Sequence, residues 1–592
     1  MKGFFVTILG LTSFALVCAT VTLDHKCKVS PGDDAWPTDD EWSMLNQTID
    51  GSLLQPKPAA AACYPGPDYN ATQCRFLVSG TFSARFWIGN PLIELSQWTQ
   101  GSTCVANTTA KGNCTQGGFP EFVVNATTVK HIQAAVNFAR NKNIRLVIKN
   151  TGHDFGGRST GAGSISVWVH YLKEIDFLPE YTTGAYAGMA VRMGAGVEAW
   201  EVSNFMAVHN ITVVAAGGNT VGGNGGWLSS GGHSLITSKY GLGSDQALSF
   251  GVVTADGDYV TADPFTNADL FWALRGGGGA TYGIVISVIL KAYPPVALTG
   301  SFLMLSVSNA TSSGSVQDAD KFWEGVSLYY RYCAKVLDTG GYGFSYIYPM
   351  ANNTFRFMIS STFPGMMPNE TQRLMQPVFN QLQAAGINAT NPKVAAARIY
   401  GSPRSGLGDR PNSTRYRSRL LPRQNWEDDE LWDRTMRAIR KAVEGGYENN
   451  FYFHGTLTSP TEDVAGWPGT DSAVHPSWRE NRMHAMLMDT QPTGLTAQQA
   501  RDRDAMMQGY MDLLREVSPG SGSYMNEGDP GEPNWQQAFY GSKYERLLEI
   551  KRKYDPWNLF WAPTTVGSEG WAIDVVDGYP NSQNGRLCRV AS

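Results

Sequence analysis

The chain has 592 residues, a formal net charge of −5, 42% hydrophobic residues and only 17% charged residues. This composition excludes a disordered or collagen-like chain, which would contain far fewer apolar residues or a regular glycine repeat. The 47 lysines and arginines nearly balance the 52 aspartates and glutamates, so the chain lacks the basic surface expected of a nucleic-acid-binding protein.

The N-terminus has the pattern of a secretory signal peptide. Lys2 precedes an apolar run from Phe4 to Val17, and small residues suited to cleavage follow near Ala19 or Thr20. We therefore expect residues 1–19 to be removed and the mature protein to be secreted and extracellular. An N-terminal membrane anchor is the alternative, but the run is shorter than the roughly 20 apolar residues of a membrane-spanning helix, so we expect no membrane association.

Asparagine sequons indicate the same compartment. Eleven Asn-x-Ser/Thr sequences occur, and in a secreted protein each is a surface acceptor for an N-glycan. They lie at Asn46, Asn70, Asn107, Asn113, Asn125, Asn210, Asn309, Asn352, Asn369, Asn388 and Asn412.

Cysteine usage is typical of an oxidising compartment. Cys18 leaves with the signal peptide, and five of the remaining seven cysteines lie between positions 27 and 114. No CxxC or HExxH motif occurs and the nine histidines show no metal-ligand spacing, so we expect no metal. Sequence alone does not determine the connectivity; proximity pairs Cys63 with Cys74 and Cys104 with Cys114, and we assign Cys27 to Cys588 and leave Cys333 as a buried free thiol.

Patterns along the chain indicate several regions. Residues 20–115 are rich in proline, cysteine and sequons, and we expect a loop-rich extension stapled by disulfides. From 116 to 300, helical and strand patterns alternate with glycine-rich turns, which indicates an α+β domain; we expect a second domain over 301–515 and a C-terminal segment over 516–592. The predicted helices are 129–141, 197–208, 428–443 and 542–554, and the predicted strands are 144–148, 164–169, 190–193, 252–254, 284–292 and 450–457.

Three glycine-rich stretches, 149–159, 217–233 and 275–283, dominate the first domain. Glycine loses much conformational entropy on folding, so this density inside an ordered domain needs a reason. Tight turns would explain any one stretch. Three of them within about 135 residues favour close approach of backbone N–H groups to a nucleotide-like cofactor.

Other cofactor and catalytic motifs have less support. A P-loop needs Gly-Lys-Ser/Thr, which the sequence lacks. The run 194–199 matches the G-x-G-x-x-A dinucleotide fingerprint, but the acidic residue expected about twenty positions later is missing from 214–223. The run 157–161 matches the G-x-S-x-G elbow of serine hydrolases, which must lead from a strand into a helix, whereas a strand is predicted after it.

Five stretches of the sequence resemble those of the vanillyl-alcohol-oxidase superfamily of FAD-linked oxidases, and of its berberine-bridge-enzyme-like branch. The resemblance covers about residues 120–300 and 515–592, and the run 522–530 is most similar to secreted fungal members often described as isoamyl alcohol oxidases. The five stretches are TGHDFGGRS at 151–159, KYGLGSD at 239–245, VTADG at 253–257, DLFWALRGGG at 269–278 and YDPWN at 554–558.

The resemblance implies a two-lobed FAD-binding domain of the PCMH type, an antiparallel-sheet substrate domain over the isoalloxazine ring, and a C-terminal segment that returns to the FAD-binding domain. It places the pyrophosphate on the loop 150–159, where backbone N–H groups bind phosphate without a cationic side chain. The isoalloxazine is expected beside the second glycine stretch and the adenine near the third. The implied FAD-binding residues are Asn150, Thr151, Gly152, His153, Asp154, Phe155, Gly157, Arg158, Ser159, Gly218, Asn219, Val221, Gly222, Gly226, Gly232, Gly283, Val285 and Asn526.

His153 occupies the position at which relatives bond the flavin 8α-methyl group through an imidazole nitrogen. A neutral imidazole is nucleophilic, and a covalent bond prevents cofactor loss outside the cell. The alternative is a turn histidine bonded to the backbone. Many relatives add a second bond from a cysteine in the next glycine stretch, which here contains none, so we expect attachment through His153 only.

The resulting prediction is a secreted, monomeric FAD-dependent oxidase that takes hydride from a substrate C–H bond, expected to be that of an alcohol, and passes the electrons to O₂. An oxidative cyclase or dehydrogenase of secondary metabolism and a carbohydrate oxidase are alternatives within the same fold. A secreted glycoprotein with a vestigial flavin site is the alternative that is not an enzyme.

The catalytic base is predicted on the segment 524–527. Carbohydrate-oxidising relatives place a Tyr-x-Asn-Tyr run over the flavin, and this sequence has Tyr524, Asn526 and Glu527 there. A strand would put Glu527 on the face opposite the other two, but a turn into 528–530 would bring it inward. We predict Glu527 as the base, with burial raising its pKa, or else a glutamate exposed to solvent. Tyr524 and His454 are reserves, and His233 is a candidate oxyanion-side donor.

Overall fold

The structure is a computed structural model that describes residues 23–591 except 80–83, 102, 309–311, 395, 409 and 493. The expected signal peptide, residues 1–19, lies outside the described residues. Within the described ranges, no helix combines the length and the apolar character that crossing a bilayer requires.

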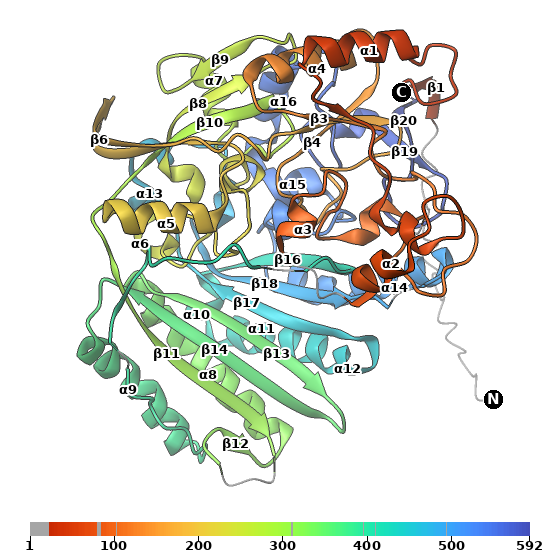
Figure 1. Ribbon diagram of the computed structural model, residues 1–592. Coiled ribbons are helices and arrows are strands. Elements are labelled where there is room, and N and C mark those ends of the chain that lie inside the picture. The colour runs from red at the N-terminus through yellow and green to blue at the C-terminus, as the bar shows by residue number, and fades with distance from the viewer. Residues whose placement is uncertain are drawn as a thin grey trace, which may run out of the picture.

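The first lobe is a four-stranded sheet in the order β2-β3-β5-β4, with β3, β5 and β4 parallel. Helix α4 joins β3 to β4, and it begins where the side chain of Thr128 accepts a hydrogen bond from the backbone of His131. Its apolar side packs with helix α1 over the sheet (Figure 1). The bounds are β2 Leu53–Leu54, β3 Phe122–Asn125, α4 Val129–Asn141, β4 Arg145–Lys149, β5 Ser164–Trp168 and α1 Asp39–Thr48.

The second lobe is an antiparallel sheet in the order β6-β7-β10-β8-β9. Helices α7 and α16 lie beside it, and helix α5 follows β7. Because β7 has only antiparallel neighbours, the strand and helix around 194–199 do not form the parallel βαβ unit that a dinucleotide fingerprint needs. The bounds are β6 Ile175–Thr183, β7 Tyr186–Gly194, α5 Ala199–His209, β8 Ala247–Val253, β9 Tyr259–Ala262, α7 Ala268–Ala273, β10 Ile284–Lys291 and α16 Tyr544–Tyr554.

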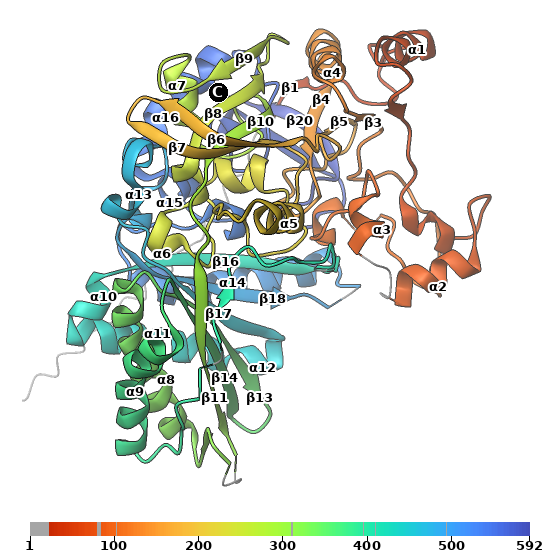
Figure 2. The ribbon, with the colours of Figure 1, turned by 60° about the vertical axis from the view of Figure 1, so that its left-hand side comes forward.

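The third layer is a large sheet in the order β12-β11-β14-β13-β17-β18-β16, antiparallel except for the β11–β12 pair. Helices α8, α9, α11 and α14 pack on one of its faces and form a large apolar core with it (Figure 2). The bounds are β11 Ala297–Val307, β12 Ser315–Val316, α8 Ala319–Asp338, β13 Tyr342–Met350, β14 Thr354–Pro364, α9 Pro368–Ala384, β16 Thr414–Pro422, α11 Asp429–Glu444, β17 Phe451–Leu457, β18 Asn481–Thr490 and α14 Ala497–Glu516.

The C-terminal segment returns to the first two lobes. Strand β20 (Gly585–Val590) pairs with β1 (Leu23–Cys27) and β19 (Trp571–Val575), so the two ends of the described chain meet. All three expected disulfides are confirmed, and Cys333 is the buried free cysteine. The bonds join Cys27 to Cys588, Cys63 to Cys74 and Cys104 to Cys114.

The structure adds three local details. The extension before residue 115 contains the regular helix α1, whose Thr38–Glu41 capping box the irregular composition obscured. The segment after Tyr524 is no strand but a single 3₁₀ turn, Met525–Glu527, so the two-face argument does not apply to it. The serine-hydrolase alternative fails as reasoned, because Ser164–Trp168 is a strand.

Candidate active site

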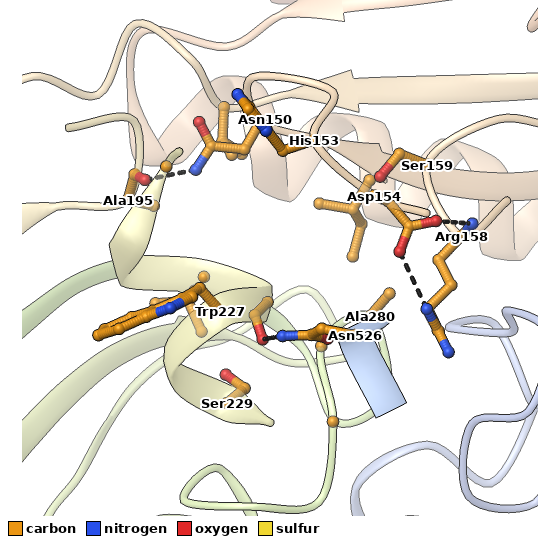
Figure 3. Close-up of a pocket in the computed structure, with 18 of the residues that line it drawn as sticks. Asn150, His153, Asp154, Arg158, Ser159, Ala195, Trp227, Ser229, Ala280 and Asn526 are labelled. Atoms are coloured by element: carbon orange, nitrogen blue, oxygen red, sulfur yellow. Dashed lines mark hydrogen bonds and ion pairs between the residues drawn. The ribbon is translucent and has the colours of Figure 1, made fainter. Parts of the chain in front are cut away.

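One elongated pocket brings the three glycine-rich stretches together (Figure 3). It encloses about 1210 Å³, its open mouth included, and lies among both lobes and the C-terminal segment. Residues 150–155 and 158–159 line it from the first stretch, residues 221, 222, 225–227 and 229 from the second, and residues 278–285 from the third. Tyr524, Asn526 and Glu527 of the C-terminal segment also line it.

The loop after β4 is held rigid by its own side chains. The Asp154 carboxylate accepts hydrogen bonds from the backbone N–H groups of Gly156 (2.9 Å) and Arg158 (2.6 Å). The Arg158 guanidinium bonds to the same carboxylate at 3.0 Å and to the carbonyl oxygen of Met525 at 2.9 Å. Gly152 and Gly157 have φ of +85° and +78°, a conformation that favours glycine. The loop therefore presents backbone to the cavity and is tied to the C-terminal segment.

Glycine at 222 and 279 lets backbone segments approach closely. A Cβ on Gly222 would lie 2.4 Å from the amide nitrogen of Asn150, and one on Gly279 would lie 2.7 Å from the Cα of Gly226. A Cβ on Gly226, in contrast, would meet nothing within 4 Å. The walls are thus packed against each other but leave an open, backbone-lined cradle, which fits the extended shape and phosphate groups of FAD.

His153 lies at the pocket wall, where its Nε2 is 2.8 Å from the hydroxyl oxygen of Thr220. Its ring also contacts that of Trp87, with centroids 5.1 Å apart. Thr220 and Trp87 therefore hold the imidazole in place beside the space that the cofactor would fill. Thr220 was not expected from the sequence.

The expected FAD-binding residues fall into two groups. Gly157, Gly218, Asn219 and Gly232 do not line the pocket; the amide of Asn219, for example, donates to the Leu407 carbonyl oxygen at 2.9 Å. The pocket is lined by the others: Asn150, Thr151, Gly152, His153, Asp154, Phe155, Arg158, Ser159, Val221, Gly222, Gly226, Gly283, Val285 and Asn526.

Glu527 belongs to a cluster with two histidines. Its carboxylate oxygens lie 3.3 and 3.4 Å from Nε2 of His233, and one of them lies 3.3 Å from Nδ1 of His484. His484 is fully buried, on β18, and sequence reasoning missed it. The ligand atoms of the three side chains lie within 4.8 Å of one another, a spacing that would admit a metal ion although the sequence showed no such motif.

The pKa of Glu527 moves opposite to expectation. Burial alone would raise the pKa of this carboxyl, but His233, followed by His484 and His454, lowers it to about 2. The imidazoles of His484 and His454 are themselves uncharged at neutral pH, because burial lowers their pKa to about 3 and about 4. Glu527 is therefore a carboxylate surrounded by imidazoles, and the expected rise of its pKa is wrong.

The reserve residues have different surroundings. Tyr524 is fully buried, which raises the pKa of its phenol, and its oxygen accepts a hydrogen bond from the Asn526 amide at 2.9 Å. The same amide donates to the carbonyl oxygen of Gly226 at 3.1 Å. His454 lies outside the pocket lining, with Nδ1 2.7 Å from the Ser345 carbonyl oxygen. Tyr524 thus lies at the pocket and His454 behind it.

Buried ion pairs fix the segment that carries these groups. The Asp529 carboxylate is 2.8 Å from the guanidinium of Arg417 on β16, and Arg417 also contacts Asp489 on β18 at 3.3 Å. Arg417 and both aspartates are almost fully buried. The turn containing Glu527 is therefore anchored to the large sheet.

Comparisons with known proteins agree with this geometry. A family model described as "FAD binding domain" matches residues 120–263, and one described as "Berberine and berberine like" matches residues 523–567. The chain is 34% identical to the FAD-linked oxidoreductase patO of Penicillium expansum, over 96% of this chain and 95% of patO. It is 32% identical to the bifunctional decalin synthase calF of Penicillium decumbens, over 95% of this chain and 96% of calF.

A solved structure is also similar. The VAO-type flavoprotein MtVAO615 from Myceliophthora thermophila C1 superposes with a TM-score of 0.84 at 32% identity, covering 95% of this chain and all of that one. The expected two-lobed FAD-binding fold with its antiparallel substrate domain is therefore confirmed.

Proposed function

Because this chain belongs to the VAO-type FAD-linked oxidoreductases, we propose that it is a secreted oxidase that removes hydride from an alcohol C–H bond, with covalently bound FAD as acceptor and O₂ as the final oxidant. One observation carries this proposal: a single pocket is lined by all three glycine-rich stretches and by Tyr524, Asn526 and Glu527. When bound, FAD supplies the hydride acceptor and the route of electrons to O₂, which leaves as H₂O₂.

Different residues of the pocket would bind different parts of FAD. Backbone N–H groups of the loop 150–159 would hold the pyrophosphate, and the Asp154–Arg158 pair keeps that loop in shape. His153, the only residue proposed to attach the cofactor covalently, is oriented by Thr220. Gly225 and Gly226 line the pocket without a side chain, and a Cβ on Gly226 would meet nothing within 4 Å.

The Glu527–His233 pair is the proposed acid/base unit. Oxidation of an alcohol requires loss of the hydroxyl proton as hydride leaves the carbon. The ionised Glu527 carboxylate is in contact with the His233 ring, and a carboxylate beside an imidazole orients it and stabilises its protonated form. We therefore place the substrate hydroxyl next to this pair, with the Tyr524 phenol as a neutral hydrogen-bond donor to the same oxygen.

Secretion, glycosylation and a monomeric state complete the proposal. Three disulfides are consistent with an oxidising compartment, where such bonds persist. Ten of the eleven sequons lie in the described residues, and Asn309 lies outside them. Endoglycosidase treatment of the secreted protein is expected to lower its mass by several glycans.

A second candidate, an oxidative cyclase or dehydrogenase of secondary metabolism, is favoured by the name of one relative, the bifunctional decalin synthase calF. Oxygen consumption and H₂O₂ release are to be measured over a panel of alcohols, aldehydes and oligosaccharides. Turnover of a simple alcohol supports the first candidate. Anaerobic flavin reduction without oxygen uptake would make the protein a dehydrogenase, and no reduction by any alcohol would refute the alcohol oxidase.

A further inference from the structure

The large sheet has one face covered by helices and one face open. Alternate residues of its strands, such as Leu303, Ile347 and Leu487, belong to the core under α8, α9, α11 and α14. The residues between them point the other way, and Figures 1 and 2 show helices against one side of this sheet only. We call fifteen of these residues on β18, β17, β13, β14 and β11 the open face.

Strand register arranges the open face in three rows that cross the sheet from β18 to β11. Paired residues of neighbouring antiparallel strands lie side by side on the same face. The first row is His484, Thr456, Phe344, Ser360 and Phe302, and the second is Met486, His454, Tyr346, Met358 and Met304. The third is Met488, Tyr452, Tyr348, Arg356 and Ser306, in which the rings of Tyr452 and Tyr348 are in contact, with centroids 5.0 Å apart.

Exposure increases along the rows. At the inner end His484 is fully buried and Met486 nearly so, whereas at the outer end Phe302 is 51% and Met304 43% exposed. Phe344, between them, is 37% exposed. Large apolar side chains that are exposed together on one surface mark a binding site in a soluble protein. The open face is therefore a mainly apolar surface that extends from the protein interior to solvent.

The buried end of the open face lies at the cluster of Glu527, His233 and His484. His484 contacts the Glu527 carboxylate at 3.3 Å, and the ring of His454 packs on Phe344 and Tyr346 with centroids 4.4 and 4.5 Å apart. Four strand spacings separate β18 from β11. At about 4.8 Å each they span about 19 Å. The open face thus begins at the proposed reaction site, and its length matches that of several linked aromatic rings.

The side chains of the open face decide what chemistry it suits. None of the fifteen is Asp, Glu, Asn or Gln, the residues that supply most hydrogen bonds to sugar hydroxyls. Arg356, at the outer corner, is the single side chain of the fifteen with a permanent charge. Phenyl, phenol and thioether groups predominate, which suits an uncharged apolar surface.

We propose that the open face binds the body of an elongated, uncharged aromatic or polycyclic substrate while its reacting alcohol end reaches Glu527 and His233. The inference rests on the proposed function, since it takes the Glu527 end as the reaction site. Such a surface disfavours an oligosaccharide as substrate.

Binding of unreactive probes to the holoenzyme tests this inference separately from catalysis. Benzamide, biphenyl-4-carboxamide and p-terphenyl-4-carboxamide are titrated by calorimetry, with cellotetraose as the sugar probe. We expect affinity to rise about tenfold with each added ring, since a ring laid on one apolar face buries about half the area of a fully buried phenyl group. We expect no measurable binding of cellotetraose.

Two variants of the open face test whether the gain in affinity arises there. Phe302→Ser/Met304→Ser is expected to remove the gain from the third ring and to leave benzamide binding unchanged, while Phe265→Ser, a 71% exposed phenylalanine outside this sheet, is expected to change nothing. Met304→Glu is expected to weaken the terphenyl probe at least tenfold. The inference would be overturned if affinity did not depend on the number of rings, if both open-face variants bound the three aromatic probes as the wild type does, or if cellotetraose bound tightly. Failure of every alcohol to reduce the flavin, with the ring series intact, would refute the proposed function alone.

Discussion

Replacing Glu527 with glutamine tests the proposed acid/base unit most directly. The amide keeps the size of the side chain and its contacts at 3.3 Å with His233 and His484, but it carries no charge and accepts no proton. We expect Glu527→Gln to keep the flavin bound and its spectrum unchanged. We expect the rate of flavin reduction by substrate to fall.

The size of the fall follows from the site. A carboxylate with a pKa of about 2 is ionised at neutral pH, so every wild-type molecule carries a negative charge against the His233 ring. Removal of a general base or its orienting carboxylate slows reaction by about 10² to 10⁴. The expected loss of about 10² or more therefore corresponds to about 3 kcal/mol or more in the activation barrier.

Anaerobic stopped-flow reduction by a substrate alcohol is the assay, because it isolates the hydride step from reaction with oxygen. Glu480→Gln is the matched control, since it makes the same chemical change at an exposed position. A reduction rate within a few-fold of wild type in Glu527→Gln would remove Glu527 from the role. Tyr524→Phe and then His454→Gln would become the variants to examine.

Four further outcomes are expected. After denaturation in acid or urea, FAD should stay with the wild-type protein, whereas in His153→Ala it should be absent or released. Free flavin from the wild type, or residual covalent flavin in the variant, would contradict a single bond through His153. Alkylation under denaturing, non-reducing conditions should add one label, at Cys333, and two labels would contradict the disulfides. Dialysis against a chelator should leave flavin reduction unchanged, and a loss restored by a divalent cation would instead assign the histidine–glutamate cluster to a metal. The folded-state pKa of Glu527 is depressed from 4.5 to about 2, so its carboxylate stabilises the fold above about pH 4.5 and stabilises it less as the pH falls toward 2. The melting temperature of Glu527→Gln should therefore lie below that of the wild type at pH 6, and the difference should narrow toward pH 3. A difference that is constant with pH would contradict the pKa shift.

Local sequence signals were sufficient for several features of the molecule. The helix Val129–Asn141 and the strand pattern around Arg145–Lys149 depend on apolar periodicity and a threonine cap, which are properties of neighbouring residues. Two disulfides close loops of ten or eleven residues, so proximity in the chain decides them. The glycine density likewise indicated a backbone-lined site, because close approach excludes a Cβ wherever it occurs.

The sequence named Glu527 and His233 as candidates, but only the tertiary structure brought them together with His484 and revealed the open face. His233, His484 and Glu527 are separated by 251 and 43 positions, and no local pattern links residues that a sheet and a distant turn bring within 3.4 Å. The direction of the Glu527 pKa shift depends on which charged or polar groups surround the carboxylate, and the sequence indicated only that aromatic residues would be near. Phe302 and Phe344 belong to ordinary alternating strands, and strand order alone places them on one uncovered face. Sequence thus determined the elements and the glycine-rich backbone of the pocket, whereas pairing between distant strands decided which side chains meet at the proposed reaction site.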